Sequence, residues 1–495
     1  MQKLVIAGGG TAGWLAAAAL AQQFRGILDV TLIESDEIGT VGVGESTIPT
    51  IRGFHRLLGI DEQAFMRATS ATFKLGIHFE NWKLPQHRYA HAFGRVGLST
   101  WICGFHHFWL HSLTRGMCSE LEDYCVERLA SKQHKFATSP DSEINYAYHL
   151  DAGVYAKFLR KMSEHDGARR IEGKITEVRQ HPDTGFIESL VLDSGQVVEG
   201  DFFIDCTGFR GLLIEQTLQS GFEDWSHWLP CDRAVAVQTE SVGPAVPYTL
   251  SAAHEAGWRW RIPLQHRVGN GLVYCSRYMS DEEATGKLLR EVQGRTLTQP
   301  RVIRFRAGRR RCTWNKNVVA LGLASGFLEP LESTSIHLIM SGITRLMQLF
   351  PFGGVQPCLV EHYNRATRTE LESIRDFIVL HYHATEREDT PFWRHVRSMA
   401  IPESLAHRLE MFRSCAHVWQ HEGELFRTDS WLQVMLGQGV QPRRYHHYAR
   451  AMSDHDLERL LTGLRRSVAE TVRELPSHQE FLDRYCRATE ILDAS

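Results

Sequence analysis

The segment LVIAGGGTAG, residues 4–13, decides the fold. An apolar run ends at Ala7, glycines follow at Gly8, Gly10 and Gly13 in a GxGxxG pattern, and residues 14–24 are predicted to form a helix. In such a turn the first glycine permits the bend, the second lets the backbone approach a pyrophosphate, and the third lets the helix pack against the strand. The helix N-terminus, with Thr11 and Ala12, then faces the phosphates. The segment therefore predicts a dinucleotide site.

A second apolar run, residues 30–33, ends at Glu34, roughly 20 residues past the last glycine, where an acidic residue binds the adenosine ribose. A glycine-rich turn without a ligand is the alternative. The order of strand, glycines, helix, strand and acid favours the nucleotide site.

Length and composition indicate a soluble enzyme. The chain has 495 residues, enough for two or three subdomains, and a net charge of −3, which gives no basis for nucleic-acid or membrane binding. No apolar stretch reaches the ~20 residues that span a bilayer, and no signal peptide is expected. The ten cysteines include no CxxC pair, so we expect a cytoplasmic setting. The 26 histidines include three close pairs without metal-ligand spacing. We expect these pairs on solvated loops and predict no metal site.

Along the chain, strand and helix patterns alternate, which predicts an α/β fold with a largely helical C-terminal region. Helical patterns cover 45–84, 119–131, 151–162 and 336–349, and strand patterns cover 171–178, 186–192, 197–204, 234–239, 258–263, 271–278 and 318–321. We expect a nucleotide-binding core over 1–355, with an inserted β-rich segment, and a helical region over 356–495 that completes the substrate site.

Three further motifs are candidates for ligand binding. Asp205 follows a strand, at a carboxyl-end crevice of the sheet. The segment 42–49 (GVGESTIP) combines glycines, which allow backbone approach to a planar ring, with hydroxyls that can cap a helix, and an ordinary glycine loop is the alternative. Residues 333–335 (STS) precede a helix, where backbone N–H groups can bind an anion, although capping alone explains the hydroxyls equally well.

With these motifs, WRWRIP at 258–263 makes the chain resemble the tryptophan-halogenase branch of the flavin-dependent halogenases, over nearly its whole length. The matching pieces also include TFKLGI at 72–77, HAFG at 91–94, DCTGFRG at 205–211 and LESTS at 331–335. The resemblance implies a glutathione-reductase-type, Rossmann-like FAD-binding fold. It implies reduced, diffusible FAD that reacts with oxygen, after which halide is oxidised to hypohalous acid. A separate NAD(P)H-dependent flavin reductase is the expected partner of a monomer or homodimer.

The resemblance also assigns roles to residues. Hypohalous acid crosses a tunnel to the catalytic Lys74, which hydrogen-bonds it or forms a haloamine, while Glu332 orients the oxidant and takes the ring proton. Trp258 and Trp260 lie beside the flavin and favour halogenation over hydroxylation. The remaining expected contacts are FAD at Gly8, Gly10, Thr11, Ala12, Gly13, Glu34, Gly44, Glu45, Ser46, Asp205 and Gly322, halide at Thr334 and Ser335, and substrate at His91, Phe93 and Trp431.

The chain departs from the family pattern in places that bear on the substrate. Ser335 replaces a glycine, and serine disfavours positive φ, so the halide loop is expected to differ in shape and the choice of chloride or bromide stays open. Gly322 is followed by Leu323 rather than the aspartate usual in hydroxylases, which favours halogenation. The segment 421–439 is a compact lid without the tyrosine pair that grips free tryptophan. We therefore expect an indole-like aromatic substrate, and keep an FAD-dependent hydroxylase or a non-catalytic flavin-binding protein as alternatives.

Overall fold

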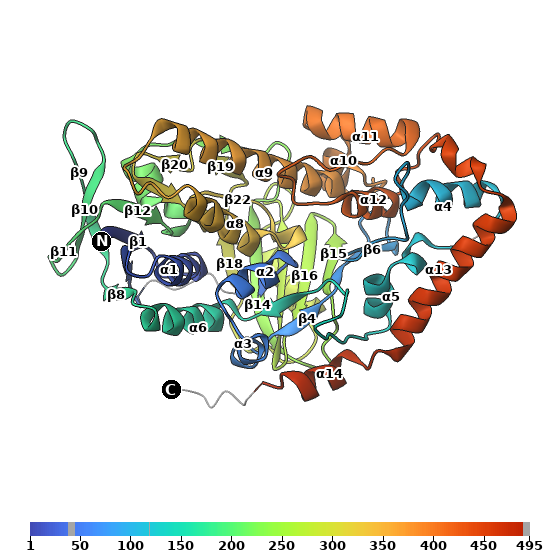
Figure 1. Cartoon of the computed structure of the whole chain (residues 1–495), viewed down its shortest axis with the longest axis horizontal. Coiled ribbons are helices and arrows are strands. Elements are labelled where there is room, and N and C mark those ends of the chain that lie inside the picture. Colours follow the sequence, from blue (N-terminus) through green and yellow to red (C-terminus); the bar gives the residue numbers. More distant parts are fainter. Residues whose placement is uncertain (38–44, 118, 489–495) are drawn as a thin grey trace.

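The computed structural model describes residues 1–37, 45–117 and 119–488, and its first layer is a six-stranded sheet of order β20-β21-β12-β1-β2-β8 (Figure 1). The strands are β1 (Gln2–Ala7), β2 (Leu28–Glu34), β8 (Arg169–Glu172), β12 (Phe202–Asp205), β20 (Trp314–Asn315) and β21 (Val318–Ala320). All neighbours are parallel except β20 and β21. The fingerprint turn joins β1 to α1 (Thr11–Gln23), so the predicted Rossmann-like α/β fold is confirmed.

Both faces of this sheet are covered. Helix α1 packs with α6 (Ala152–His165) and α8 (Ser335–Gln348) on one face, and its alanine-rich sequence lets the neighbours approach closely. The other face is covered by β9 (Ile175–Gln180), β10 (Ile187–Leu192) and β11 (Val197–Glu199), whose Leu190 lies in one apolar cluster with Val5 and Phe203. A central parallel sheet buried on both sides explains the continuous apolar run at 4–7.

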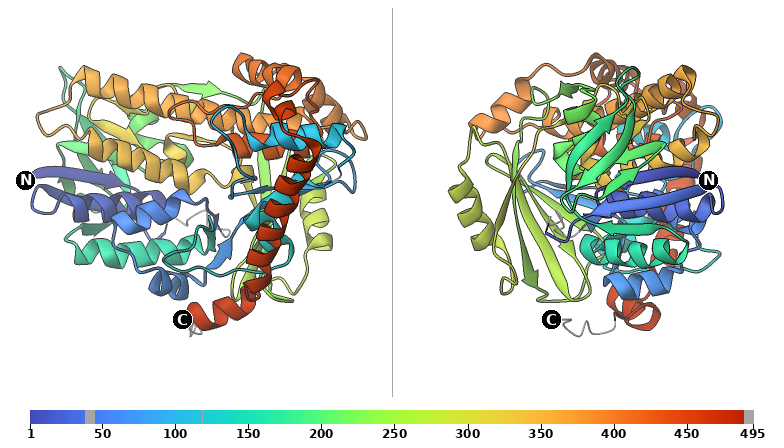
Figure 2. Two further views of the ribbon diagram at one scale, coloured as in Figure 1. Left: turned by 45° about the vertical axis from the view of Figure 1, so that its right-hand side comes forward. Right: turned by 90° about the vertical axis from the view of Figure 1, so that its left-hand side faces the viewer.

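The second layer is a seven-stranded sheet of order β18-β14-β17-β16-β15-β5-β6, seen edge-on in Figure 2 (right). Its strands are β5 (Gly76–Glu80), β6 (Arg88–Ala92), β14 (Arg233–Glu240), β15 (Thr249–His254), β16 (Gly257–Pro263), β17 (Arg267–Tyr274) and β18 (Arg301–Arg304). One smaller sheet consists of β3 (Glu45–Ser46), β4 (Thr72–Lys74) and β7 (Ala147–Leu150). Another consists of β13 (Phe222–Asp224), β19 (Gly308–Arg310) and β22 (Gly326–Phe327).

The predicted helical stretch 45–84 is wrong over its second half. Helices α2 (Thr50–Leu57) and α3 (Glu62–Thr69) form, but β4 and β5 follow. The segment 72–80 (TFKLGIHFE) has apolar side chains at 73, 75, 77 and 79, which is the period of a strand, so the helical prediction overlooked a signal that the sequence carries. The error matters because β4 carries Lys74.

The C-terminal helices are α9 (Pro357–His383), α10 (Pro391–Ser398), α11 (Glu403–Cys415), α12 (Thr428–Gly437), α13 (Asp454–Glu474) and α14 (His478–Tyr485). The remaining helices are α4 (Phe105–Thr114), α5 (Val126–Lys132), α7 (Asp281–Glu291), the 3-10 turns η1 (Leu121–Tyr124), η2 (Gly208–Arg210), η4 (Gly322–Ala324), η5 (Pro330–Glu332) and η6 (His447–Ala451), and the π-helix η3 (Leu212–Thr217). Helices α9 to α12 share one apolar cluster with the seven-stranded sheet, in which Phe377 and Trp431 pack with Trp258. The helical C-terminal region is therefore confirmed.

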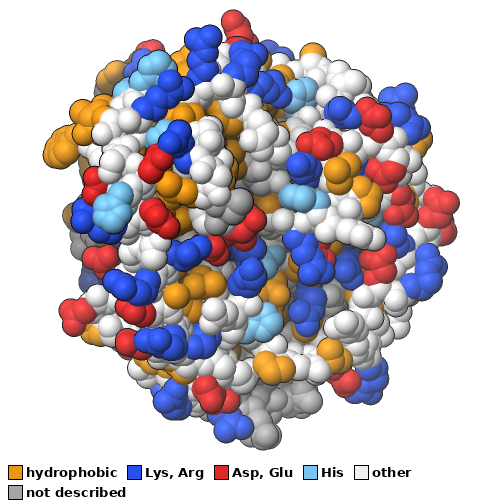
Figure 3. All heavy atoms as spheres, turned by 90° about the vertical axis from the view of Figure 1, so that its right-hand side faces the viewer, with side chains coloured by type: hydrophobic (Ala, Val, Ile, Leu, Met, Phe, Trp, Pro, Cys, Tyr) orange, Lys and Arg blue, Asp and Glu red, His pale blue; other side chains and the backbone are white. Residues whose placement is uncertain are grey.

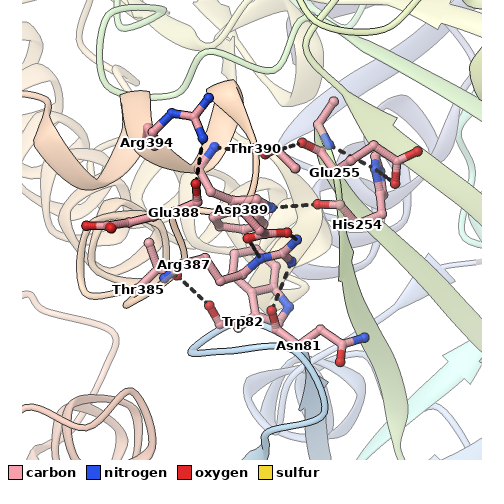
Figure 4. Close-up of polar contacts among 12 residues, drawn as sticks. Asn81, Trp82, His254, Glu255, Thr385, Arg387, Glu388, Asp389, Thr390 and Arg394 are labelled. Atoms are coloured by element: carbon pink, nitrogen blue, oxygen red, sulfur yellow. Dashed lines mark hydrogen bonds and ion pairs between the residues drawn. The ribbon is translucent and has the colours of Figure 1, made fainter.

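The connection from α9 to α10 is fixed to the seven-stranded sheet (Figure 4). Thr385 Oγ1 donates to the Trp82 carbonyl at 2.7 Å, and Arg387 donates to the Asn81 carbonyl at 3.0 Å and pairs with Asp389 at 2.7 Å. Thr390 Oγ1 donates to the Glu255 carbonyl at 2.7 Å. These bonds hold the C-terminal end of α9, and with it His381 and Tyr382, against the strands.

The histidine pairs do not follow the sequence expectation uniformly. His106 and His107 are buried in α4, where His106 Nε2 lies 2.8 Å from the Ala416 carbonyl, and His381 is fully buried in α9. The expectation of solvated loops is thus wrong for these residues, while His446 and His447 are exposed. The residues that flank His106 and His107 in α4, Phe105 and Phe108, are buried as well.

Among residues 1–37, 45–117 and 119–488, no helix is long and apolar enough to cross a membrane, and no group of three or more His, Cys, Asp or Glu is placed to hold a metal ion. The described cysteines are all free. On the face in Figure 3, basic and acidic side chains are interspersed. Such a surface lacks the single-sign field of a nucleic-acid-binding face.

Candidate active site

Lys74 lies in β4 and is fully buried. Its Nζ donates to the Thr47 carbonyl at 3.0 Å and to Ser333 Oγ at 2.9 Å, and lies 5.1 Å from the centre of the Phe93 ring. Burial lowers the pKa of Lys74 to about 7, although the charge of Glu332 opposes the shift. The amine is therefore poised to change protonation state near neutral pH.

Glu332 ends the turn η5 and is also fully buried. One oxygen lies 2.7 Å from His91 Nδ1 and the other lies 2.8 Å from His381 Nε2. Burial alone would raise the pKa of Glu332, but the contacts with His91 and His381 outweigh it and lower the pKa to about 2. Glu332 is thus an ionised carboxylate clamped between two imidazoles.

His381 continues this chain of polar contacts. Its Nδ1 lies 2.8 Å from the Tyr89 hydroxyl, and its backbone carbonyl accepts from Gln438 Nε2 at 2.8 Å. Sequence reasoning missed His381, because α9 meets η5 only in the folded chain. The same reasoning assigned His91 to substrate stacking, whereas its Nδ1 contacts Glu332 and its ring lies 6.3 Å from that of Phe93.

The loop after Glu332 has one strained residue. Ser333 adopts φ +61°, in the left-handed region, and its hydroxyl accepts from Lys74. Ser335 begins α8 without positive φ, which agrees with the preference of serine, and the left-handed backbone lies two residues earlier. No side chain of the described residues caps α8 at Thr334, which leaves N–H groups of its first turn available to an anion.

The nucleotide fingerprint has the predicted geometry. Gly8 has φ +106°, and a Cβ there would lie 2.4 Å from the Cys206 carbonyl oxygen. A Cβ at Gly13 would lie 1.9 Å from the Gly8 oxygen, whereas one at Gly10 would meet no described atom within 4 Å. No described side chain caps α1 at Gly10. An open space beside an uncapped helix N-terminus fits the pyrophosphate of a dinucleotide.

The comparisons with known proteins agree on one family. The Tryptophan halogenase family profile matches residues 3–454. The chain is 36% identical to the tryptophan 6-halogenase SttH of Streptomyces toxytricini, covering 97% of each chain. The solved structure of Xcc4156, a flavin-dependent halogenase from Xanthomonas campestris, superposes with a TM-score of 0.97 at 55% identity, covering 99% of each chain.

The chain belongs to the tryptophan halogenase family. BrvH, a flavin-dependent halogenase from Brevundimonas sp. BAL3, is similar too, with a TM-score of 0.93 at 44% identity over 98% of this chain and 99% of that one. The protein is therefore a flavin-dependent halogenase, and the Lys74–Glu332 site lies within that family's fold. This membership favours halogenation over the hydroxylase and the non-catalytic protein that the sequence alone left open.

The other predicted flavin contacts of this halogenase lie around the fingerprint. Gly322 has φ +61°, and a Cβ there would lie 3.0 Å from Ala12 Cβ. Glu34 accepts from Trp14 Nε1 at 3.2 Å and from Arg170 Nε at 2.6 Å. The carboxylate of Asp205 is fully buried and accepts from the backbone N–H groups of 207, 213 and 214, so any contribution to the flavin site comes through the turn it holds.

The segment before α2 is only partly described. Gly44 lies outside the described residues. Glu45 and Ser46 form β3, and Ser46 Oγ lies 2.8 Å from Thr249 Oγ1. Burial, with a contribution from the charge of Asp151, raises the pKa of Glu45 to about 7. Its side chain is thus easier to neutralise than an ordinary glutamate.

The two tryptophans of the halogenase lie on one face of β16, with ring centres 6.0 Å apart. Trp258 Nε1 donates to Glu329 Oε2 at 3.0 Å, and the Tyr382 hydroxyl donates to the same oxygen at 2.6 Å. Burial raises the pKa of Glu329 to about 7. Sequence reasoning missed Glu329 and Tyr382, although each is close in sequence to a residue of the Glu332 site.

Trp431 is the third residue that the resemblance assigns to the substrate. It is buried in α12, with its ring 4.8 Å from Phe377 and 4.1 Å from the Arg408 guanidinium carbon. Phe377 in turn lies 5.5 Å from His91. Trp431 therefore supports the side chains around His91.

Proposed function

We propose that this halogenase uses reduced FAD, oxygen and halide to make hypohalous acid, which halogenates an electron-rich, indole-like aromatic through Lys74. The observation that carries the proposal is a buried amine beside a buried carboxylate: Lys74 donates to Ser333, and the adjacent Glu332 lies between His91 and His381. Burial lowers the pKa of the amine, and the two imidazoles lower the pKa of the carboxylate. Such opposite environments suit one group to hold or give a proton and the other to accept one.

The flavin would be held by the open cradle at Gly10 and the N-terminus of α1, with Glu34 placed for a ribose hydroxyl. Bound reduced FAD would supply the two electrons that turn oxygen and halide into hypohalous acid. We propose that it is diffusible and delivered by a separate flavin reductase, and that the halide, chloride or bromide, lies at the start of α8, near Thr334 and Ser335.

Lys74 would position the oxidant for attack. Its ammonium can donate a proton to the oxygen of hypohalous acid, so that water leaves as the oxygen–halogen bond breaks and the ring carbon bonds to the halogen. Its neutral amine can instead form a haloamine, and a pKa of about 7 makes both forms present at neutral pH. Glu332 would then take the ring proton, which restores aromaticity.

Both parts of the chain contribute to this site. Lys74 and Glu332 come from the proposed core, residues 1–355, and His381 comes from the proposed helical region, residues 356–495. Phe93, whose ring faces the Lys74 ammonium, is placed to stack on an electron-rich ring. SttH is by name a tryptophan 6-halogenase. For this chain we propose an indole without the amino-acid end, since its lid lacks a tyrosine pair.

The test is mass spectrometry of reactions that contain indole, FAD, NADH, a flavin reductase, and either chloride or bromide. We expect a product whose mass follows the halide, with bromide at least as good as chloride. The control omits both halides and should give no product. A hydroxylated indole that forms at the same rate without halide would contradict the proposal.

A further inference from the structure

An aromatic wall lies beside His91, made of Phe377 from α9 and Phe426 from the segment before α12. The two rings stack with centres 3.8 Å apart and planes 21° apart. The His91 ring lies 5.5 Å from Phe377 and 5.9 Å from Phe426. Because His91 contacts Glu332, the wall begins one side chain away from the carboxylate.

The wall is held in place. Gln433 in α12 accepts from the Ala92 N–H at 3.0 Å and donates to the Ala92 carbonyl at 3.1 Å, which ties α12 to the strand that carries His91. The wall itself is buried, since Phe377 is 0% and Phe426 is 4% exposed. A substituent of a substrate ring that points toward the wall would therefore contact apolar side chains that are held in place.

The charged groups next to the wall already have partners within the described chain. Arg408 pairs with Glu424 at 2.6 Å and lies over the rings of Trp419 and Trp431. Asp376 is paired with Arg375 at 2.8 Å, and Asp429 accepts from the Val96 N–H at 3.3 Å. Arg427 is exposed. The Glu332 carboxylate, on the far side of His91, already has both oxygens in contact with His91 and His381. The wall thus offers no free counter-charge to a buried ammonium or carboxylate.

We propose that Phe426 is a specificity-determining residue, which makes the enzyme prefer indoles whose 3-substituent is uncharged. The inference rests on the proposed function, because it concerns the substrate of the same site. An ionised group that is buried without a partner loses its hydration and gains nothing in exchange. An apolar group of the same size loses no hydration and gains area burial.

The test compares 3-propylindole with tryptamine, which differ in a terminal methyl against a terminal ammonium. The ratio of their kcat/KM values is measured with FAD, a reductase and bromide, and their Kd values are measured without flavin. For the wild type we expect both measures to favour 3-propylindole by about 100-fold or more. Phe426→Ala should reduce this preference at least about tenfold, because water can then reach the ammonium.

Two controls isolate the apolar ring. Phe426→Leu keeps an apolar group and should hold the preference within about threefold of the wild type. Phe350→Ala makes the same truncation in the core below α8, where its ring contacts Phe24, Phe202 and Phe352, and should leave the preference unchanged. If Phe426→Ala does not fold, the polar Phe426→Gln, which leaves a smaller cavity, replaces it with the same expectation.

Equal kcat/KM and Kd values of the wild type for 3-propylindole and tryptamine would overturn the inference. The wild-type preference in Phe426→Ala or Phe426→Gln would overturn it as well. These results leave the proposed function intact. Failure to halogenate either indole in any halide would instead overturn the proposed function, and the flavin-free Kd values would still decide whether the wall discriminates charge.

Discussion

Replacing Lys74 by methionine should stabilise the protein at neutral pH. Burial lowers the pKa of Lys74 from 10.5 to about 7. This lowered pKa means that the buried Lys74 ammonium destabilises the folded protein by at most about 5 kcal/mol at pH 7 and below. The substitution also removes the hydrogen bonds to the Thr47 carbonyl and Ser333, and each lost bond reduces the gain in stability by roughly 1 to 1.5 kcal/mol. Lys74→Met, which keeps the length of the side chain, is therefore expected to gain about 2 kcal/mol.

The sign of the effect depends on pH. Between about 7 and 10.5 the unfolded chain holds the Lys74 proton and the folded chain does not, so wild-type stability rises with pH. The advantage of Lys74→Met should therefore be largest at and below about pH 7 and vanish by about pH 9.5. A chain of 495 residues shifts Tm by about 1 °C per kcal/mol, so the expected gain is about 2 °C at pH 7.

Differential scanning calorimetry at pH 7 and pH 9.5 measures this directly. Lys161→Met, at an exposed position of α6, is the matched control and should show no such pH dependence. A Tm difference between wild type and Lys74→Met that is the same at both pH values would refute the reasoning, as would a variant that melts 2 °C or more below the wild type at pH 7.

Three further predictions concern the carboxylates. Glu332→Gln should lower kcat about 100-fold or more, measured at saturating indole, and an unchanged kcat would leave Glu332 a structural role only. His381→Phe removes one of the groups that lower the Glu332 pKa, so the acid limb of the kcat–pH profile should move to higher pH, and an unmoved limb contradicts this positioning role. Near pH 4.5, Glu329→Gln can keep the contacts with Trp258 and Tyr382 and should melt like the wild type, whereas Glu329→Leu leaves both donors unpaired at about 1 to 3 kcal/mol each and should melt lower. Because burial raises the Glu329 pKa to about 7, its contribution to wild-type stability should fall as pH rises from about 4.5 to 7, a fall that calorimetry should not find in Glu329→Gln.

The nucleotide-binding half was predictable because its signals are local. The glycines at 8, 10 and 13 act within one turn, and β1 and β2 are short apolar runs with defined ends. The strand with Trp258 and Trp260 was found for the same reason. In each case the residues that specify the structure are neighbours in the chain.

The active site was only half predictable, because tertiary contacts assemble it. Lys74 was expected within the helical stretch 45–84, but it lies in β4, which pairs with β7 and is buried on both faces. His381 and Glu329 carry no motif of their own, and their roles appear only where α9 meets η5. The strained Ser333 was also missed, since its φ follows from a turn rather than from residue type.

The measurement that tests the central claim most directly is the yield of halogenated indole from wild type and Lys74→Ala, with oxygen consumption recorded in the same reactions. The account predicts that Lys74→Ala consumes oxygen as the wild type does, gives no halogenated indole, and releases its oxidant to a small hypohalite trap in solution. Wild-type yields of halogenated indole from Lys74→Ala would contradict the account.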